Sequence, residues 1–218
     1  MCVLVSCFYF KGDWLSNFIS TRTYRKVFYC AGNQTVTVNM MCQENSYQYM
    51  HDENNNFQCV KIPYKQRDFS MLIVLPDAKD GVDAVVKCIS QNRIEHLEKN
   101  NKFYSRSLRL QIPRFRVQVR MNLDSHLKAL GIKNAFKQSA NFREMTVNDK
   151  MHIYQVVHRC EVEVTEDGNA AVAATGTDAM YFSALSCQSH PFTVDRPFVY
   201  MIKHRKQTLF MGIVYGFL

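Results

Sequence analysis

The stretch Glu166-Asp-Gly-Asn-Ala-Ala-Val-Ala-Ala-Thr-Gly-Thr-Asp-Ala-Met-Tyr-Phe182 decides how this 218-residue chain is interpreted. After Gly168 only small side chains follow for eight positions. The helix propensity is lowered by Asn169, Val172, Thr175 and Gly176, and no apolar face at helical spacing appears. The pattern therefore favours an exposed loop or strand over a short helix. As a strand it has two nearly featureless faces, so it can enter a crowded sheet without requiring large pockets.

Six separated stretches of the chain resemble the serpin family. The segment from Glu166 to Thr175 resembles the hinge of a serpin reactive-centre loop. Five further stretches fit the family in the same order: Phe10-Lys-Gly-Asp-Trp14, Leu108-Arg-Leu-Gln-Ile-Pro-Arg-Phe115, Leu127-Lys-Ala-Leu-Gly-Ile132, Phe192-Thr-Val-Asp-Arg-Pro-Phe-Val-Tyr-Met-Ile202 and Thr208-Leu-Phe-Met-Gly212. The resemblance runs from end to end of the chain, but it corresponds only to the C-terminal part of a serpin.

The resemblance implies a serpin-like mixed fold with several β-sheets and few helices. The chain would be a single truncated serpin domain over residues 1–218, with an exposed reactive-centre loop at about 166–190. The residue pattern agrees, because strand-like runs outnumber helical ones and do not alternate with them regularly. The fold class expected from the sequence is therefore α+β.

The resemblance also implies a serine protease inhibitor that acts as a suicide substrate, and not an enzyme. Family spacing from the hinge places the reactive bond at Phe182-Ser183, with Tyr181 and Met180 as alternatives for the residue before the bond. All three are large and apolar, so the implied partner is a serine protease with a chymotrypsin-like pocket. From Gly168 to Phe182 the chain can extend roughly 50 Å at about 3.3 Å per residue, enough to run along a large sheet.

Two groups of residues are assigned by the resemblance alone. The hinge consists of small residues after an acidic one: Glu166, Gly168, Asn169, Ala170, Ala171, Ala173, Ala174 and Thr175. Inhibitory members usually have a small hydroxyl residue where Asn169 stands, and burying its amide without a partner costs about 1–3 kcal/mol. The sheet-opening region comprises Ser6, Trp14 and His158. Ser6 stands in place of the usual asparagine partner of the histidine, and plain core packing is the alternative for Trp14.

The apolar run Met1 to Phe10 suits a buried central strand, and it lacks the basic start and cleavage site of a signal peptide. In the family, helices and two strands of the same sheet precede this strand. A fragmentary gene model, a short isoform and a decayed copy are all open explanations. The chain as written is expected to be poorly soluble or oligomeric, and at best a protease substrate, since an uncovered edge strand invites aggregation.

The net charge of +8 raises a separate hypothesis, an unrelated basic module with an acidic partner. Three functions therefore stay open: an inhibitor, a truncated non-inhibitory serpin-like fragment that is a substrate or binding protein, and this basic module. The densest basic run, Lys203-His-Arg-Lys206, lies between two strand-like runs and favours a solvated turn over a nucleic-acid patch. No membrane or nucleic-acid partner is expected.

The eight cysteines favour free thiols over a disulfide framework. Cys7, Cys30, Cys42 and Cys160 lie in or beside apolar runs, where cysteine often acts as a small core residue. This leans toward a reducing compartment such as the cytoplasm, whereas the family default is extracellular. No phosphate loop, dinucleotide fingerprint or zinc spacing is present, so no cofactor and no metal are expected, and His152 and His158 are expected to be structural.

Alternating and apolar runs predict the remaining elements. Strands are expected at Val36–Met40, Phe57–Pro63 and Phe69–Pro76, over Ser107–Val119 with a bend at Pro113, at Met151–Val164, and in a hairpin formed by Pro197–Lys203 and Thr208–Tyr215. Turns are expected at 52–56 and 65–68. One or two short helices are expected between Gly81 and Asn100, and an amphipathic helix from Asn122 to Leu130, closed by Gly131.

Overall fold

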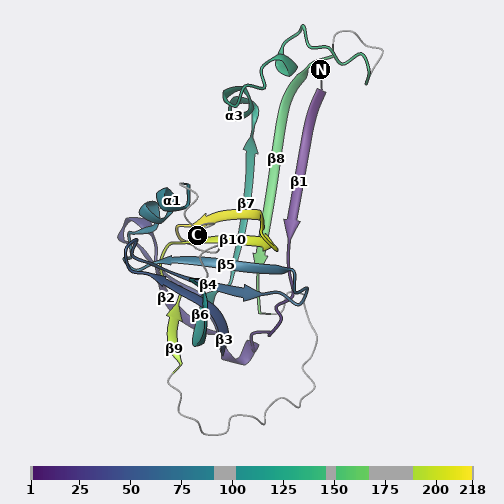
Figure 1. Cartoon of the computed structure of the whole chain (residues 1–218). Coiled ribbons are helices and arrows are strands. Elements are labelled where there is room, and N and C mark those ends of the chain that lie inside the picture. Colours follow the sequence, from purple (N-terminus) through teal and green to yellow (C-terminus); the bar gives the residue numbers. More distant parts are fainter. Residues whose placement is uncertain (1, 91–101, 146–150, 167–188, 218) are drawn as a thin grey trace. The chain divides into compact units, whose positions relative to one another are not determined.

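The computed structural model describes residues 2–90, 102–145, 151–166 and 189–217 (Figure 1). These residues form two compact units, each assembled from two stretches of the chain. The first unit contains Met1–Lys11 and Arg116–Glu163, and the second contains Gly12–Phe115 and Val164–Leu218. The interpretation of residues 1–218 as one domain stays a prediction, and the two units are described separately below.

The first unit is built on a three-stranded sheet in the order β1-β8-β7. Its strands are β1 (Cys2–Phe10), β7 (Phe115–Asn122) and β8 (Ile153–Val164). Figure 1 shows β1 and β8 side by side, and they pair in parallel from Val3 opposite Gln155 to Phe10 opposite Val162. The short helix α3 (Asp124–Ala129) and the 3-10 turn η3 (Asn134–Phe136) follow β7.

Helix α3 forms inside the predicted range 122–130, but it begins two residues later and ends one residue earlier than the sequence predicts. The side-chain oxygen of Asn122 accepts a hydrogen bond from the backbone N–H of Asp124 at 3.0 Å, which satisfies a donor at the start of the helix. At the other end Gly131 adopts φ +97°, a left-handed conformation that glycine takes without steric cost. The backbone N–H of Ile132 then donates to the carbonyl of Leu127 at 2.9 Å and closes the last turn.

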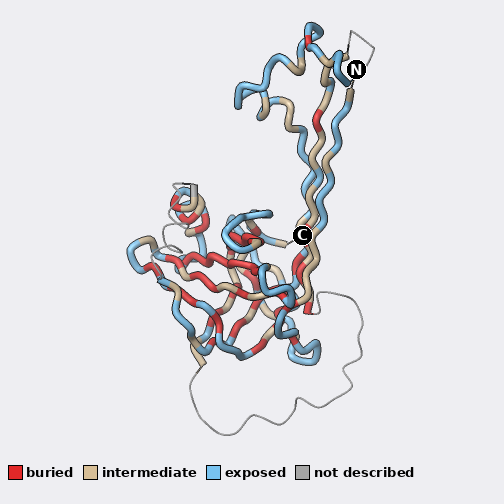
Figure 2. Tube along the Cα trace, turned by 45° about the vertical axis from the view of Figure 1, so that its right-hand side comes forward, coloured by how far each residue is buried: buried red, intermediate tan, exposed pale blue. Residues whose placement is uncertain are grey.

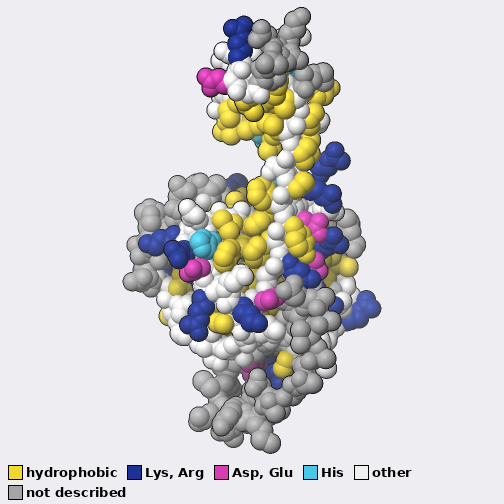
Figure 3. Space-filling model, turned by 90° about the vertical axis from the view of Figure 1, so that its right-hand side faces the viewer, with side chains coloured by type: hydrophobic (Ala, Val, Ile, Leu, Met, Phe, Trp, Pro, Cys, Tyr) yellow, Lys and Arg dark blue, Asp and Glu magenta, His cyan; other side chains and the backbone are white. Residues whose placement is uncertain are grey.

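Strand β1 forms as predicted, but its predicted burial is wrong. None of its nine residues is buried, and Val3, Val5 and Phe8 are 51%, 67% and 54% exposed. The cause is its position, because in the described part of the chain β1 is the edge strand of its sheet and pairs with β8 alone. Figure 2 shows this exposure along the strand, and Figure 3 shows hydrophobic side chains on the surface of this unit.

The second unit contains an eight-stranded sheet in the order β11-β10-β5-β4-β3-β6-β9, with β2 paired to β3. Neighbouring strands are antiparallel except for β6 and β9, which are parallel. Its elements are β2 (Tyr24–Tyr29), β3 (Thr35–Asp52), β4 (Phe57–Pro63), β5 (Phe69–Pro76), β6 (Tyr104–Pro113), β9 (His190–Thr193), β10 (Phe198–His204), β11 (Gln207–Val214), the helix α1 (Val82–Ser90) and the 3-10 turns η1 (Ser20–Arg22) and η2 (Ala31–Asn33).

Strand β5 lies in the middle of the core of this unit. All its residues except Phe69 are buried, as the continuous apolar run predicts for a strand covered on both faces (Figure 2). On one face helix α1 packs its apolar side chains over β4, β5 and β10. The buried residues of this cluster are Met50, Phe57, Cys59, Leu72, Val74, Val82, Val85, Cys88, Val199 and Met201.

Aromatic side chains pack around Phe198 in the core of this unit. Phe198 lies with its ring centroid 5.6 Å from that of Phe115 and 6.5 Å from that of Phe28. Gly212 on β11 faces the ring of Tyr200, and an added Cβ there would lie 2.5 Å from the tyrosine hydroxyl. Any side chain at this position would therefore displace the tyrosine. Together the two units confirm the expected fold class, α+β with more than one sheet and few helices.

Two further predictions need correction. The strand expected over Ser107–Val119 is two strands, β6 and β7, that belong to different sheets and are separated at Arg114, immediately after Pro113. Proline has no N–H to continue a ladder, which favours a break at this point. The solvated turn expected at Lys203–Lys206 is formed only by its second half, because Lys203 is 2% exposed and pairs opposite Ser70.

The seven cysteines in the described residues are free thiols. Cys59 and Cys88 are buried in the core, whereas Cys7 is exposed and Cys30, Cys42 and Cys160 are half-buried. The expected core role is therefore wrong for Cys7, because its strand has an uncovered surface. Cys187 lies outside the described residues. In this part of the chain no helix is long and apolar enough to cross a membrane.

Candidate functional site

The start of the predicted hinge is fixed by a buried carboxylate. Glu166 is 3% exposed, and its side chain accepts a hydrogen bond from the hydroxyl of Thr23 at 2.6 Å and another from the guanidinium of Arg114. Its backbone carbonyl accepts a hydrogen bond from the N–H of Phe18 at 3.2 Å. Main chain and side chain are therefore both anchored at the last residue before the segment 167–188.

The ionised form of Glu166 is the stable form in this environment. Burial raises the pKa of the carboxyl group, but the hydrogen bonds from Arg114 and Thr23 and the positive charge of Arg114 lower it more. The net effect is a pKa below the ordinary value for glutamate. A charge buried with its partners is stable, whereas removing the partners would leave it uncompensated.

Trp14 holds the residue immediately before Glu166 by a hydrogen bond. It is 2% exposed, stacks on Tyr64 with ring centroids 4.5 Å apart and meets Phe18 edge-on at 6.0 Å. Its indole N–H donates to the backbone carbonyl of Thr165 at 2.8 Å. Trp14 therefore has both roles. Its ring packs in the core, and its indole N–H binds the residue before Glu166.

Ser6 and His158 lie opposite each other on the paired strands β1 and β8. Both are half-buried, and the His158 ring lies 5.7 Å from the ring of Phe8. No hydrogen bond joins the Ser6 and His158 side chains in the described residues, in keeping with the short serine side chain. These two residues belong to the first unit, whereas Trp14 and Glu166 belong to the second.

The other assigned loop residues lie outside the described residues. These are Gly168, Asn169, Ala170, Ala171, Ala173, Ala174 and Thr175 of the hinge, and Met180, Tyr181, Phe182 and Ser183 around the reactive bond. The description resumes at Ser189, and β9 follows at His190 and pairs with β6. Both ends of the segment 167–188 are therefore held by the second unit.

A histidine metal site finds no support in the described residues, where no group of three potential ligands comes together. The side-chain Nδ1 of His152 is buried without a hydrogen-bond partner there, and its backbone carbonyl accepts from the N–H of Cys2 at 2.9 Å. His152 thus holds the start of β1 through its main chain.

Sequence reasoning missed the partners of Glu166. Arg114 is part of the Leu108–Phe115 stretch that resembles the family, but nothing in the pattern gives it a role. Thr23 lies 143 positions from Glu166 and carries no local signal at all. Tyr64, which stacks on Trp14, follows the Pro63 that ends β4 and resembles an ordinary turn residue.

Comparisons with known proteins agree with the fold. The family model described as "Serpin (serine protease inhibitor)" matches residues 1–216. The chain is 32% identical over 216 residues to leukocyte elastase inhibitor of Bos taurus, covering 96% of this chain and 57% of that protein. It is 28% identical over 211 residues to antichymotrypsin-2 of Bombyx mori, covering 97% and 56%.

Solved serpin structures are similar to this chain in fold. Uncleaved ovalbumin is similar with a TM-score of 0.82 and 26% identity, covering 98% of this chain and 54% of that one. A serpin from the trematode Schistosoma haematobium shares the fold with a TM-score of 0.85 at 24% identity, covering 97% and 56%. The chain thus spans about half the length of the relatives it matches. On the match over residues 1–216, the chain belongs to the serpin family of serine protease inhibitors.

This arrangement makes a prediction about pH. Because the folded-state pKa of Glu166 is lowered, its contribution to the free energy of unfolding is present above the unfolded-state pKa of about 4.3 and is lost as the pH falls through the folded-state value. Glu166→Gln should therefore destabilise the fold by about 1–3 kcal/mol near neutral pH and by much less in acid. Urea unfolding over a pH series measures both effects.

The matched control for this variant is Glu53→Gln, which removes the same charge from an exposed turn after β3. It should change the free energy of unfolding little at any pH. Equal losses for Glu166→Gln at neutral and acidic pH would contradict the role given to the carboxylate.

Proposed function

We propose that this chain presents residues 166–190 to a serine protease as a reactive-centre loop, and that the protease attacks the bond between Phe182 and Ser183. Family membership supports the general activity. The related proteins antichymotrypsin-2 and leukocyte elastase inhibitor carry names that refer to chymotrypsin and to an elastase. The aromatic side chain of Phe182 suits a deep apolar specificity pocket and favours a chymotrypsin-like target.

The observation that carries this proposal is the anchored Glu166. A bait loop needs ends that are fixed to the body of the protein, since binding to a protease is stronger when less freedom is lost. Glu166 supplies one fixed end through Thr23, Arg114 and Phe18, and β9 supplies the other. The 22 positions between Glu166 and Ser189 contain the rest of the predicted hinge and the predicted reactive bond.

The proposed reaction begins as ordinary peptide hydrolysis. The protease serine attacks the carbonyl carbon of Phe182, the bond to the nitrogen of Ser183 breaks, and the new amine takes a proton. Phe182 is then joined to the protease as an ester. If this acyl-enzyme is hydrolysed the chain is a substrate, and if it persists the chain is an inhibitor.

Insertion of the cut loop as an extra strand, a known property of serpins, separates these outcomes. The β1–β8 pair fits as the place of insertion. A segment that turns back after β8 runs antiparallel to β8, and therefore also to β1, because these two strands are parallel. Insertion between them would replace one parallel ladder by two antiparallel ladders, whose hydrogen bonds are somewhat more stable per residue. The small side chains at positions 169–175 require little space on either face.

A second candidate function, cleavage without trapping, is favoured by the surface of β1. Val3, Val5 and Phe8 are all more than half exposed. A sheet that exposes apolar side chains gains stability by associating with other surfaces, so it competes with insertion of the loop. Asn169 also opposes insertion, because burying its side-chain amide without a hydrogen-bond partner costs free energy.

Titrating chymotrypsin with the chain distinguishes these functions. The proposed inhibitor should give an SDS-resistant complex that contains both polypeptides and should abolish protease activity near an equimolar ratio. Cleaved chain together with fully active protease would establish the second candidate instead. Intact chain after prolonged incubation would contradict both.

A further inference from the structure

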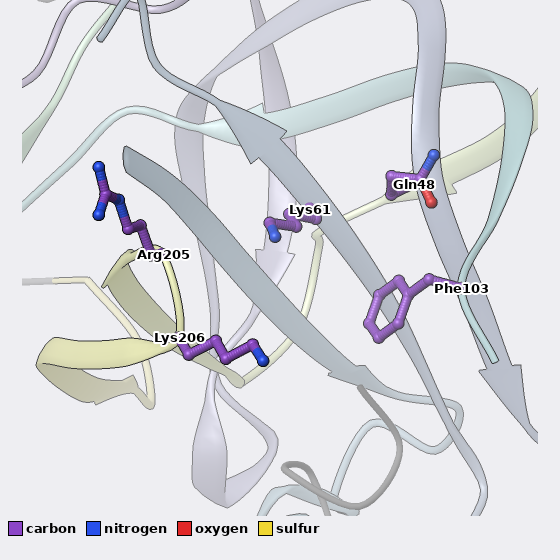
Figure 4. A pocket seen from close by; sticks show the side chains of 5 residues that line it. All are labelled: Gln48, Lys61, Phe103, Arg205 and Lys206. Carbon is purple, nitrogen blue, oxygen red and sulfur yellow. The ribbon is translucent and has the colours of Figure 1, made fainter. Parts of the chain in front are cut away.

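A hollow with a positively charged lining lies on the second unit. It has a volume of about 230 Å³ and is lined by Gln48, Lys61, Phe103, Arg205 and Lys206 (Figure 4). We call it the basic hollow. Among these five described residues three carry a positive charge and none carries a negative one. Figure 4 shows Lys61 and Lys206 coming from different elements, a strand and a turn, with Phe103 and Gln48 together at one side.

The fold brings these side chains together from four separate places. Gln48 on β3 and Lys61 on β4 are directly opposite each other in the antiparallel ladder, so both side chains leave the same face of the sheet. Arg205 and Lys206 form the turn between β10 and β11, where Arg205 has a left-handed φ of +53°. The backbone N–H of Arg205 donates to the carbonyl of Asp68 at 2.7 Å and fixes this turn.

Phe103 gives the hollow an apolar wall. It is half-buried immediately before β6, and it packs against the core cluster that α1 covers. One part of the ring is therefore held by the core, while the rest lines the hollow. An aromatic ring fixed in this way offers a flat surface to an apolar group of a bound molecule.

The positive charges of the hollow are only partly neutralised. The guanidinium of Arg205 pairs with the carboxylate of Asp68 at 3.2 Å, and both side chains are largely exposed. Lys61 and Lys206 have no acidic partner within residues 2–90, 102–145, 151–166 and 189–217. Like charges that share a small hollow repel each other at separations shorter than the Debye length of about 8–10 Å. A bound anion would replace this repulsion by two attractive interactions.

We propose that the basic hollow binds an aromatic ester of phosphate or sulfate. The two lysine ammonium groups would hold the oxyanion as point charges, the Gln48 amide would donate a further hydrogen bond, and the ester ring would pack on Phe103. None of the five residues named above belongs to the predicted loop, and this inference does not rest on the proposed function. Phosphate and sulfate share the tetrahedral oxyanion that the hollow would recognise.

Calorimetric titration of the full chain at low ionic strength tests this inference. Phenyl phosphate and phenyl sulfate are the probes, and inorganic phosphate and sulfate are the matched ions without the ring. We expect each ester to bind more tightly than its free ion. Phe103→Ala should reduce this preference, because it removes the apolar wall. Equal binding of ester and free ion would contradict the ring contact, and no binding of any probe would overturn the site.

Charge variants show whether the hollow itself is responsible. Lys61→Gln and Lys206→Gln should each weaken binding of phenyl phosphate by roughly tenfold, since each removes one charge-assisted interaction. Lys133→Gln is the control, because it removes the same charge from an exposed position in the first unit and should change binding by less than about twofold. Lys206 lies in an exposed turn, so its variant tests the site even if Lys61→Gln unfolds. Equal weakening by all three variants would show attraction by net charge alone and overturn the inference.

Discussion

Phe182→Asp is expected to slow cleavage of the chain by chymotrypsin by at least about a hundredfold. A deep apolar pocket stabilises an aromatic ring, whereas a carboxylate in the same pocket would lose its hydration without gaining a partner. Loss of even one methylene from such a pocket costs about 10–200-fold, so removing the ring and adding a charge costs at least as much. The rate is measured as kcat/KM from the appearance of the cleaved fragments in mass spectrometry.

Phe182→Tyr is the matched control for this variant. It keeps an aromatic ring, and the cleavage rate should stay within about tenfold of the original. The masses of the fragments also test the position of the bond directly. A first cut of the unmodified chain outside residues 180–185 would be incompatible with the assignment. Cleavage after Tyr181 or Met180 would move the reactive bond to one of the alternatives.

The sequence predicts which segments form strands and helices more reliably than it predicts which of them are buried. The apolar run of β5 and the alternating run of β4 are strands in the structure, and Gly131 closes α3 as its position indicates. The run Cys2–Phe10 is just as apolar as β5 but is exposed. An apolar run indicates the preference of its side chains, whereas burial depends on which other elements cover it. The residues that cover a strand lie far from it in the sequence, so the run itself does not reveal them.

The candidate site shows the same limit. The resemblance identified Glu166 as the start of the hinge, and it paired Ser6 with His158, which do lie opposite each other. It gave no role to Thr23 or Arg114, although these residues hold the Glu166 carboxylate in its buried position. Hydrogen bonds between residues 52 and 143 positions apart leave no periodic pattern in a single sequence. Only the folded chain brings these side chains together.

One substitution in the hinge tests whether the cut loop inserts beside β1. Ala173→Arg should leave cleavage after Phe182 intact but abolish the SDS-resistant complex. The insertion proposed between β1 and β8 places Ala173 on the new strand, where an arginine would carry its charge into a crowded sheet without a partner. Ser186→Arg is the matched control, because it adds the same charge beyond the cut bond, on the fragment that does not insert. It should still form the complex.

This experiment is informative even if the chain is only a substrate. In that case no complex forms with either variant, and the thermal stability of the cleaved chain becomes the measurement. An inserted strand replaces the β1–β8 ladder by two ladders, so cleavage should raise Tm for the unmodified chain and for Ser186→Arg. Cleavage should raise Tm much less for Ala173→Arg, because the charged side chain opposes insertion. An equal rise for all three proteins, or an undiminished yield of complex with Ala173→Arg, would show that residue 173 does not enter the sheet.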